Sequence, residues 1–468
     1  MYARFGKQAV VVQKYGGTSV GSVERIASVA ERIAKQYRDG YTNLAIVVSA
    51  MSGETNRLVD LVKQVNPRAN EKFYDLAVAA GEQVSIALLA AALERNGVQA
   101  RCFLAFQLGI FTDPLHAKAR IQSIDTRDIF NCWNVGILPV IAGFQGISEE
   151  GELTTLGRGG SDTSAVAIAA ALKADFCEIN TDVNGVYSAD PRLIPDARLI
   201  RELDYEVALE MAALGSKVLH SRCVELGAKY KMPIVVRNSF NPNDSERTII
   251  MNSINSTEIL EAPLVSGITL DKNIAKLSIT RLPKVSGLIT EIFGAIAERN
   301  INVDIIVHNL LADEDSMRVG FTIAREDLPA TEEVLRSLNR KPPFREMSIF
   351  AEDGFAKVSA VGVGMKSQSG VAGRIFAALS QKEVDIHMIS TSEIKVSCVV
   401  RSEVMRKPLG ARRWFGGNCA AGSSKKSLGG ATVPSPPQTP LSLFAPSGLR
   451  VTTTDQGVTT ANHSILSV

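Results

Sequence analysis

Short apolar runs alternate with longer stretches of helical periodicity through the first 260 residues. The apolar or β-branched runs, each bounded by Gly, Asp or Ser, are Val10–Gln13, Leu44–Ser49, Ile137–Ala142 and Phe176–Asn180. Apolar residues at i, i+3 and i+4 predict helices between them, at Val23–Tyr37, Val84–Asn96 and Thr163–Ala174. This alternation predicts a mainly parallel sheet with helices on both faces, and ligands of such sheets gather where the strands end.

The pattern changes near Leu264 to two copies of a smaller unit. The first copy predicts strand, helix, strand, strand and helix at 275–280, 287–299, 303–307, 316–323 and 331–339. The second repeats strand, helix, strand and strand at 356–361, 370–381, 385–390 and 394–400, without a closing helix. Such recurrence indicates an internal repeat. We therefore expect a catalytic domain over 1–260, one module over 264–345 and an incomplete second module over 346–400.

The last 68 residues, 401–468, differ in composition from the rest of the chain. They are rich in Gly, Ser, Pro and Thr and keep no period of 2 or 3.6, which predicts disorder. They hold eight Lys and Arg against two acidic residues, whereas residues 1–400 hold 43 against 47. The basic balance therefore belongs to the tail, and the body does not resemble a nucleic-acid binder.

Overall composition is typical of a soluble globular protein, with 45% hydrophobic and 21% charged residues. No stretch approaches 18 uncharged apolar residues, so we expect no membrane span. The apolar run Ala9–Val12 leads into a glycine motif, which favours a first strand over a signal peptide. Six singly spaced cysteines argue against a zinc site or a disulfide framework and indicate a reducing cytoplasm.

The first glycine-rich loop, Lys14–Ser19, lies between the first predicted strand and a helix. Gly16 and Gly17 let backbone N–H groups approach phosphate oxygens, and the helix N-terminus adds positive potential. Lys14 would place a compact positive charge on a transferred phosphoryl group. A tight turn with a surface lysine explains the segment about equally well, and the GxxxxGK[ST] pattern of a P-loop is absent.

A second glycine-rich loop, Thr155–Thr163, also leads into a helix. Arg158 offers a planar fork suited to a substrate carboxylate. The alternative is structural, with Ser161 and Asp162 capping the helix. Three glycines around an arginine exceed what a cap requires, so we favour an anion site.

Three further side chains have two explanations each. Asp182 follows a predicted strand, where it would orient Lys14 or contact a metal, and the nearby Asp190-Pro191 resembles an ordinary turn. Lys217 is either a phosphate-binding cation or an exposed helical lysine. Glu82 is either a first-turn acid that favours the helix dipole or a partner for a substrate ammonium group. The five histidines form no HExxH pattern, so no metal ligand is predicted.

Together these segments resemble the aspartate kinase family of the amino-acid kinase fold. The similar motifs are KYGGTSVG at 14–21, VVSAMSGETNRLV at 47–59, GEQVS at 81–85, FQLGIFTD at 106–113, TTLGRGGSDTSA at 154–165, TDVNGVYSADPR at 181–192 and LGSKVLHSRCVELGAKY at 214–230. They occur in the family's order over about residues 9–400. The two repeats resemble ACT modules, which are ferredoxin-like βαββαβ units that sense amino acids in this family.

The resemblance implies a three-layer α/β kinase fold and an enzyme that phosphorylates L-aspartate with ATP and Mg²⁺ at the start of lysine, threonine and methionine biosynthesis. Lys14, Arg158, Asp182 and Glu82 would be catalytic. The nucleotide would be bound by Lys14, Tyr15, Gly16, Gly17, Ser19, Thr181, Asp182, Tyr187, Ser188, Ala189, Asp190, Pro191, Arg192, Lys217 and Val218. L-Aspartate would be bound by Thr55, Glu82, Arg158, Gly159, Gly160 and Ser161. Its own ionised carboxylate is the nucleophile, so the reaction needs positioning and charge neutralisation rather than a strong base.

ACT modules of this family pair between subunits and bind lysine or threonine, which implies a homo-oligomer. The implied effector positions are Gly287, Leu288, Ile289, Asn302, Asp304, His308, Ser369, Gly370, Val371, Asp385 and Ile386. Two departures stand out in the first module. Residues 281–287 lack the usual Asp-x-Pro-Gly turn, and His308 stands where glutamine is common.

The largest departure follows strand 394–400, where the family has an amphipathic helix that covers the ACT sheet. Without that helix, we expect the kinase domain to fold and the regulatory end to be weakened or prone to aggregation. A different amino-acid kinase would lack the tandem ACT modules. A non-catalytic amino-acid sensor would be expected to have lost Lys14, Arg158 or Asp182, and all three are present.

Overall fold

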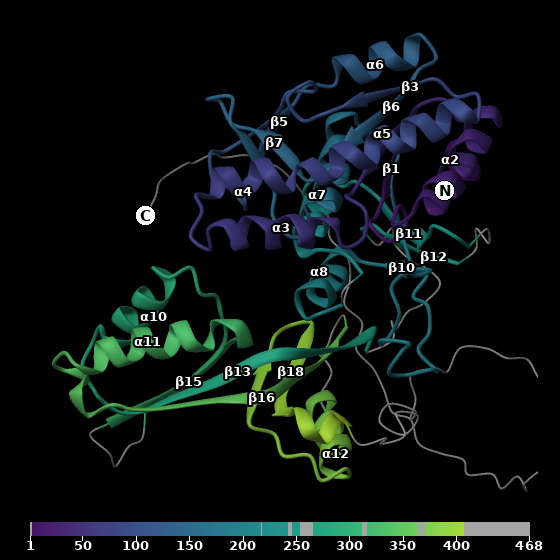
Figure 1. Cartoon of the computed structure of the whole chain (residues 1–468). Helices are drawn as coiled ribbons and strands as arrows, with labels where there is room; N and C mark the ends of the chain where they lie inside the picture. The colour runs from purple at the N-terminus through teal and green to yellow at the C-terminus, as the bar shows by residue number, and fades with distance from the viewer. Residues whose placement is uncertain are drawn as a thin grey trace, which may run out of the picture. The chain divides into compact units, whose positions relative to one another are not determined.

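The computed structural model describes residues 2–216, 218–241, 246–252, 265–310, 316–362, 365 and 370–406 (Figure 1). All described residues belong to one unit, Met1–Ala420. The sequence-based predictions for Lys217, for Ser369 and for the tail beyond Arg406 lie outside the described residues.

The larger sheet is mainly parallel. Its strand order is β10 (Glu202–Leu203), β12 (Arg247–Ile250), β11 (Ile234–Asn238), β9 (Phe176–Thr181), β1 (Val11–Tyr15), β2 (Leu44–Val48), β6 (Leu138–Ala142) and β3 (Ala100–Phe103). β1 pairs in parallel with β2 and β9, whereas β11 and β12 are antiparallel. Every residue of β1, β2 and β6 is buried, as expected where helices cover both faces. The predicted parallel sheet is confirmed.

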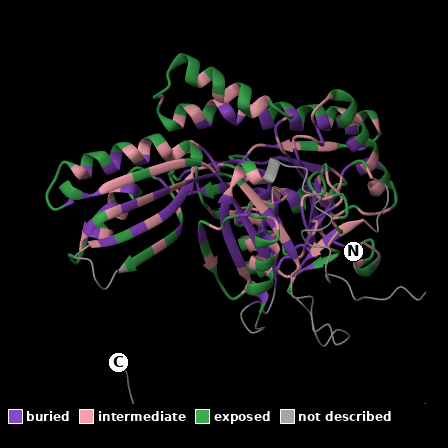
Figure 2. Cartoon of the chain, turned by 90° about the horizontal axis from the view of Figure 1, so that it is seen from below, coloured by how far each residue is buried: buried purple, intermediate pink, exposed green. Residues whose placement is uncertain are grey.

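Side chains of the central strands alternate between two cores because a strand has a period of two residues. Val12 and Val47 contribute to the core that contains residues of α7 (Gly160–Ala171), α8 (Tyr205–Ala213) and α9 (Ser221–Tyr230), with α6 (Arg127–Asn134) at its edge. Val11 and Ile46 contribute to the core beneath α2 (Val23–Arg38) and α5 (Ala80–Arg95), which the short α1 (Tyr2–Phe5) borders. Figure 2 shows the buried strands between helices that are exposed along their outer sides. The result is three layers.

A small second sheet precedes the second glycine-rich loop. Its order is β5 (Ile121–Ile124), β4 (Ile110–Thr112), β7 (Gln145–Ile147) and β8 (Leu153–Thr155). α3 (Glu54–Val65) contacts α4 (Glu71–Val78), and α4 packs against β8. Thr112 and Thr154 bond through their hydroxyl groups at 2.7 Å across this sheet. After β8 the chain continues directly into residues 156–160 of the second glycine-rich loop.

One apolar stretch, Glu71–Arg95, contains α4 and α5 in succession. By length and composition alone it is long and apolar enough to cross a membrane. The prediction based on a run of uncharged apolar residues did not identify it. Ile86, Leu89 and Leu93 of α5 are buried in the core that also contains residues of α2. Core helices of soluble proteins pass the same test, so the stretch is weak evidence for a membrane span.

The third sheet has the order β14 (Val303–Leu310), β15 (Ser316–Ala324), β13 (Gly267–Pro283), β16 (Ser348–Val361), β18 (Lys395–Arg401) and β17 (Met388–Thr391). Its strands and helices follow the two copies predicted from the sequence. α10 (Leu288–Ala297) and α11 (Leu328–Asn339) share a core with β13 and β15, and α12 (Val371–Ser380) shares another with β16 and β18. Figure 1 shows these helices at opposite ends of the sheet.

Two long strands connect these copies. The start of β13 pairs with the end of β16, at Gly267 and Val361, and the rest of β13 pairs with the start of β16, at Thr280 and Ser348. The module boundary at residues 345 and 346 stays a prediction, because both strands run through both halves. β18 ends in a 3-10 turn, η3 (Ser402–Arg406), after which the described residues stop. Shorter 3-10 turns are η1 (Arg325–Asp327) and η2 (Phe344–Glu346).

Candidate active site

Lys14 and Asp162 form a buried ion pair at the carboxyl edge of the larger sheet. Lys14 belongs to the end of β1, and Asp162 belongs to the first turn of α7. The side chains are only 10% and 12% exposed, so their attraction is weakly screened by water. Asp162 does not cap the helix, because the N-cap is Gly159 and no side chain caps it. The acid that holds Lys14 is thus Asp162, which the sequence interpretation had considered only as a cap.

Asp182 lies elsewhere, in the exposed turn after β9. Its Oδ1 accepts a hydrogen bond from Thr181 Oγ1 at 3.2 Å, and no contact with Lys14 is among those described. Its predicted role in orienting Lys14 therefore has no support in this arrangement. Residues 14 and 162 are far apart in sequence, so no local pattern predicts that they pair. The one general indication is that strand ends and the starts of the following helices meet at the same edge of such a sheet.

The first glycine-rich loop is pressed against its neighbours. Gly16 N donates to the carbonyl of Asn180 at 3.1 Å, and the Ser19 hydroxyl donates to the same carbonyl at 3.3 Å. A Cβ added to Gly17 would lie 2.8 Å from the carbonyl oxygen of Ala50. A larger residue at position 17 would displace the backbone. The loop therefore needs glycine for close packing, and Tyr15 beside it is fully buried.

Glu82 is a buried carboxyl group with one unused oxygen. It lies in the first turn of α5 and is 3% exposed. Its Oε1 accepts from Ala50 N at 3.0 Å, while Oε2 has no hydrogen-bond partner within the described part of the chain. Burial raises the pKa of Glu82 to about 7, against the opposing effect of the bond from Ala50. A buried oxygen without a partner would gain from a ligand that donates hydrogen bonds.

The second glycine-rich loop is as tightly constrained as the first. Gly157 and Gly159 have φ of +78° and +70°, in the left-handed region that favours glycine. A Cβ on Gly159 would lie 2.4 Å from the Cβ of His220, and one on Gly160 would lie 2.7 Å from the Phe144 ring. Burial lowers the pKa of His220, which favours its neutral form. Ser161 is buried in the first turn of α7, whereas Arg158 is exposed.

The remaining predicted nucleotide and substrate residues lie mostly in surface loops. Asp190 and Arg192 bond each other, with Nε to Oδ1 at 3.0 Å and Nη2 to Oδ2 at 2.9 Å. Ser188 Oγ accepts from Arg198 N at 3.0 Å, and Tyr187 forms a β-bridge with Leu199. Pro191 is exposed and Ala189 is buried, while Thr55 of α3, Thr181 at the end of β9 and Val218 are partly buried.

The predicted effector positions fall at different places in the third sheet. Gly287 and Gly370 are the N-caps of α10 and α12, with φ of +93° and +87°, followed by Leu288, Ile289 and Val371. Asn302 precedes β14, which carries Asp304 and His308, and the Asp304 carboxylate pairs with the buried ammonium of Lys357. Asp385 and Ile386 instead line a cavity of about 300 Å³ near the end of α12, with Phe376, Ser380, Glu383 and Val384.

Metal ligands do not gather anywhere in the residues that the structure describes, since no three His, Cys, Asp or Glu side chains are arranged to hold an ion. Acidic groups near the candidate site are single carboxylates such as Asp162. This donor set suits a cation that arrives with most of its ligands already in place, as Mg²⁺ does on a nucleoside triphosphate.

Comparison with known proteins places this geometry in context. The chain matches the amino acid kinase family over residues 9–238 and an ACT domain over residues 358–411. An aspartate kinase of Stutzerimonas stutzeri is 47% identical over 397 residues, covering 85% of this chain and 94% of that protein. The crystal structure of E. coli aspartokinase III with aspartate and ADP is 26% identical, with a TM-score of 0.70, covering 85% of this chain and 98% of that one. The same E. coli enzyme with lysine and aspartate has a TM-score of 0.65. The resemblance and the kinase–ACT architecture predicted from the sequence are confirmed.

Proposed function

Since the chain belongs to the aspartate kinases of the amino acid kinase family, we propose how its own residues perform the transfer of a phosphoryl group from ATP to L-aspartate. The observation that carries the proposal is the buried pair Lys14–Asp162, which joins the start of the first tightly packed glycine-rich loop to the end of the second. Asp162 holds the Lys14 ammonium in a fixed place at the sheet edge where ligands of such folds bind. Residues 1–260 form the catalytic domain, and two ACT modules follow over 264–345 and 346–400.

L-Aspartate is held by groups of opposite charge. Glu82 accepts the substrate ammonium on Oε2, the oxygen without a partner, and Arg158 binds the α-carboxylate as a planar fork. Thr55, Gly159, Gly160 and Ser161 lie around the substrate. The side-chain carboxylate then points toward the phosphoryl group, because both ends of the amino-acid backbone are fixed.

The triphosphate is bound by the first loop. Lys14 neutralises charge on the transferred phosphoryl group, and Asp162 keeps the ammonium in place between turnovers. Gly16, Gly17 and Ser19 lie around the phosphates. The rest of the nucleotide site comprises Tyr15, Thr181, Asp182, Tyr187, Ser188, Ala189, Asp190, Pro191, Arg192, Lys217 and Val218. Mg²⁺ that arrives with ATP would supply further charge neutralisation, and Asp182 after β9 would be a carboxylate that contacts it.

Phosphoryl transfer needs no proton to move. A carboxylate oxygen of aspartate forms a bond to the γ-phosphorus while the bond from that phosphorus to the bridging oxygen breaks, which leaves ADP and 4-phospho-L-aspartate. Both the nucleophile and the leaving group are oxygen anions under neutral conditions. The absence of a strong base from the proposed set therefore agrees with the chemistry.

Regulation belongs to the ACT modules in this proposal. An E. coli relative is known with lysine bound, and this chain keeps the ACT helix starts at Gly287 and Gly370. Lysine, threonine or both inhibit the enzyme by binding between modules of paired subunits, so the protein is a homo-oligomer of the cytoplasm. The effector positions are those predicted from the sequence.

Acyl-phosphate formation tests the function directly. The purified protein is incubated with ATP, Mg²⁺ and L-aspartate, and the product is trapped with hydroxylamine, with and without lysine plus threonine. Glutamate and N-acetylglutamate serve as controls for other kinases of this fold. Aspartate-specific product supports the proposal, and suppression by either effector supports working regulation. No product from aspartate would refute the assignment.

A further inference from the structure

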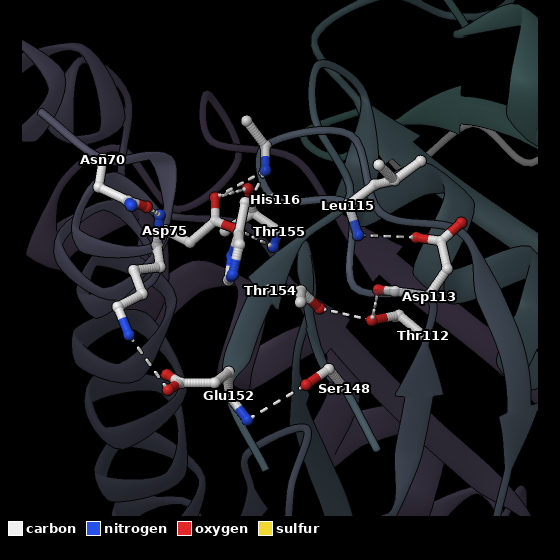
Figure 3. Close-up of polar contacts among 12 residues, drawn as sticks. Asn70, Asp75, Thr112, Asp113, Leu115, His116, Ser148, Glu152, Thr154 and Thr155 are labelled. Carbon is white, nitrogen blue, oxygen red and sulfur yellow. Dashed lines mark hydrogen bonds and ion pairs between the residues drawn. The ribbon is translucent and has the colours of Figure 1, made fainter. Parts of the chain in front are cut away.

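A carboxyl group outside the proposed site lies at the root of the loop that carries Arg158. Asp75 belongs to α4 and is fully buried. Figure 3 shows its carboxylate pointing toward His116 and Thr155. Neither the motif comparison nor the proposed reaction gives this residue a role.

The Asp75 carboxylate accepts hydrogen bonds from two separate segments. From the end of β8, it receives Thr155 N at 3.0 Å and Thr155 Oγ1 at 2.5 Å. From the 113–119 segment, it receives Ala117 N at 3.1 and 3.0 Å on its two oxygens. His116 Nδ1 lies 2.8 Å from Oδ2 and completes the set. One side chain therefore fixes both segments to α4 through buried bonds, which are costly to leave unmade.

Both segments in turn shape the second glycine-rich loop. Ala119 N donates to the carbonyl of Thr155 at 2.9 Å, so the two segments are also joined to each other. A Cβ on Gly157 would lie 2.7 Å from the carbonyl oxygen of Ala117, the residue whose N–H Asp75 binds. Ala117 itself has φ of +61°, an uncommon value for a residue with a Cβ. Any shift of residues 115–119 would therefore press directly on the loop next to Arg158.

A purely structural role is the simpler alternative, since buried carboxylates often accept backbone N–H bonds. Two observations favour an additional role in shaping the substrate-binding loop. The bonded residue Thr155 is only three positions before Arg158, and the bonded Ala117 is in contact range of Gly157. Removal of the carboxylate would thus loosen the loop that binds substrate before it loosens the central sheet.

We propose that Asp75 is a positioning residue for L-aspartate binding. It holds β8 and the 113–119 segment so that Arg158 meets the substrate α-carboxylate in a fixed place. This inference rests on the proposed role of Arg158, and it predicts a defect confined to the amino-acid substrate. The proposed ATP site is built mainly from β1, β9 and the loops that follow them, together with Lys217 and Val218. The hydrogen bonds of Asp75 in the described structure go to Thr155, Ala117 and His116, none of which belongs to that site.

Three substitutions test the proposal. Asp75→Ala removes every bond and should raise the KM for L-aspartate about tenfold or more, with the KM for ATP within about twofold of wild type. Asp75→Asn should restore much of the loss. Its amide oxygen still accepts from Ala117 N and Thr155 N, and its NH₂ group donates to Thr155 Oγ1. Lys72→Ala is the matched control, because it removes a surface ion pair (Nζ to Oε1 3.4 Å) between α4 and Glu152 before β8. Its kinetics should not change.

Protection by substrate gives an independent readout. Saturating L-aspartate should raise the unfolding temperature of wild type and Lys72→Ala more than that of Asp75→Ala, while ATP should stabilise all three alike. If Asp75→Ala does not fold, Thr155→Val replaces it. That variant loses one bond to Asp75 and should raise the KM for L-aspartate about threefold.

Several results would overturn the inference. One is a folded Asp75→Ala enzyme whose KM for L-aspartate equals that of wild type. Another is an equal rise in the KM for both substrates, which would indicate general loosening. If Asp75→Ala cannot be made, unchanged kinetics in both Asp75→Asn and Thr155→Val would have the same meaning. A wild-type protein without activity on aspartate would be a different failure, that of the proposed function itself.

Discussion

Glu82 should make the affinity for L-aspartate depend on pH near neutrality. Burial raises the pKa of this carboxyl group to about 7, so roughly half of the free enzyme carries it protonated at that pH. The protonated form cannot pair with the substrate ammonium. The substrate keeps its ammonium and both carboxylates ionised from pH 6 to pH 8, so in this range Glu82 is the group of the pair that titrates.

The magnitude follows from that pKa. If only ionised Glu82 binds substrate, the KM for L-aspartate scales with one plus the ratio of proton concentration to the acid constant. The KM should then be about tenfold higher at pH 6 than at pH 8, with most of the change below pH 7. The direction is fixed by the charge required: acid removes the carboxylate and weakens binding.

Steady-state kinetics at saturating Mg-ATP measure this, with the KM for L-aspartate determined by hydroxylamine trapping at half-unit steps of pH. The Glu82→Gln enzyme is the control. The amide of this variant keeps an oxygen for Ala50 N, but it loses the charge–charge contact with the ammonium. Its KM should be about 10- to 100-fold above that of wild type at pH 8 and flat with pH. A wild-type KM that does not vary between pH 6 and pH 8 would refute the reasoning, and so would an unaltered pH profile in Glu82→Gln.

Three further outcomes are expected. Lys14→Met should lower kcat about 10²- to 10³-fold with little change in the KM for L-aspartate, because a charge that acts on the transferred phosphoryl group is lost; a rise in KM alone would contradict this. Asp162→Asn should also lower kcat in the same assay, since Lys14 loses its buried partner; wild-type kcat would show that the pair is dispensable. Gly159→Ala should destabilise the fold by about 1–3 kcal/mol in urea unfolding, because a strained φ combines with overlap on His220. Gly97→Ala, with φ of +77° and open space around the added Cβ, should cost less; equal losses would remove the argument from overlap.

The fold was predictable where the sequence repeats a simple period. The central strands β2 and β6 are continuous apolar runs, since helices cover both faces, and β1 and β9 begin with apolar residues. All four were located to within about two residues. The small sheet was missed because β4, β7 and β8 are three residues long, too short for any period to show. α5 begins at Ala80, four residues before the predicted start.

The candidate site was predictable only in part, for a physical reason. The glycine-rich loops can be recognised from their composition. Lys14, Glu82 and Arg158 can be selected as candidates because they are charged residues within or beside glycine motifs. The partners of these side chains could not be predicted, because the pairing of Lys14 with Asp162 depends on how β1 and α7 meet in space. The same holds for Asp75, which lies 80 residues from Thr155 in sequence.

The shared strands β13 and β16 determine how the regulatory half can be dissected in the laboratory. A fragment that begins at residue 346 would contain β16, α12, β17 and β18 but would leave the end of β16 without the neighbour it has at Gly267–Asp271. That bare edge would offer unpaired backbone groups to other chains. An excised regulatory fragment should therefore start before Gly267, so that it contains the start of β13, which pairs with the end of β16.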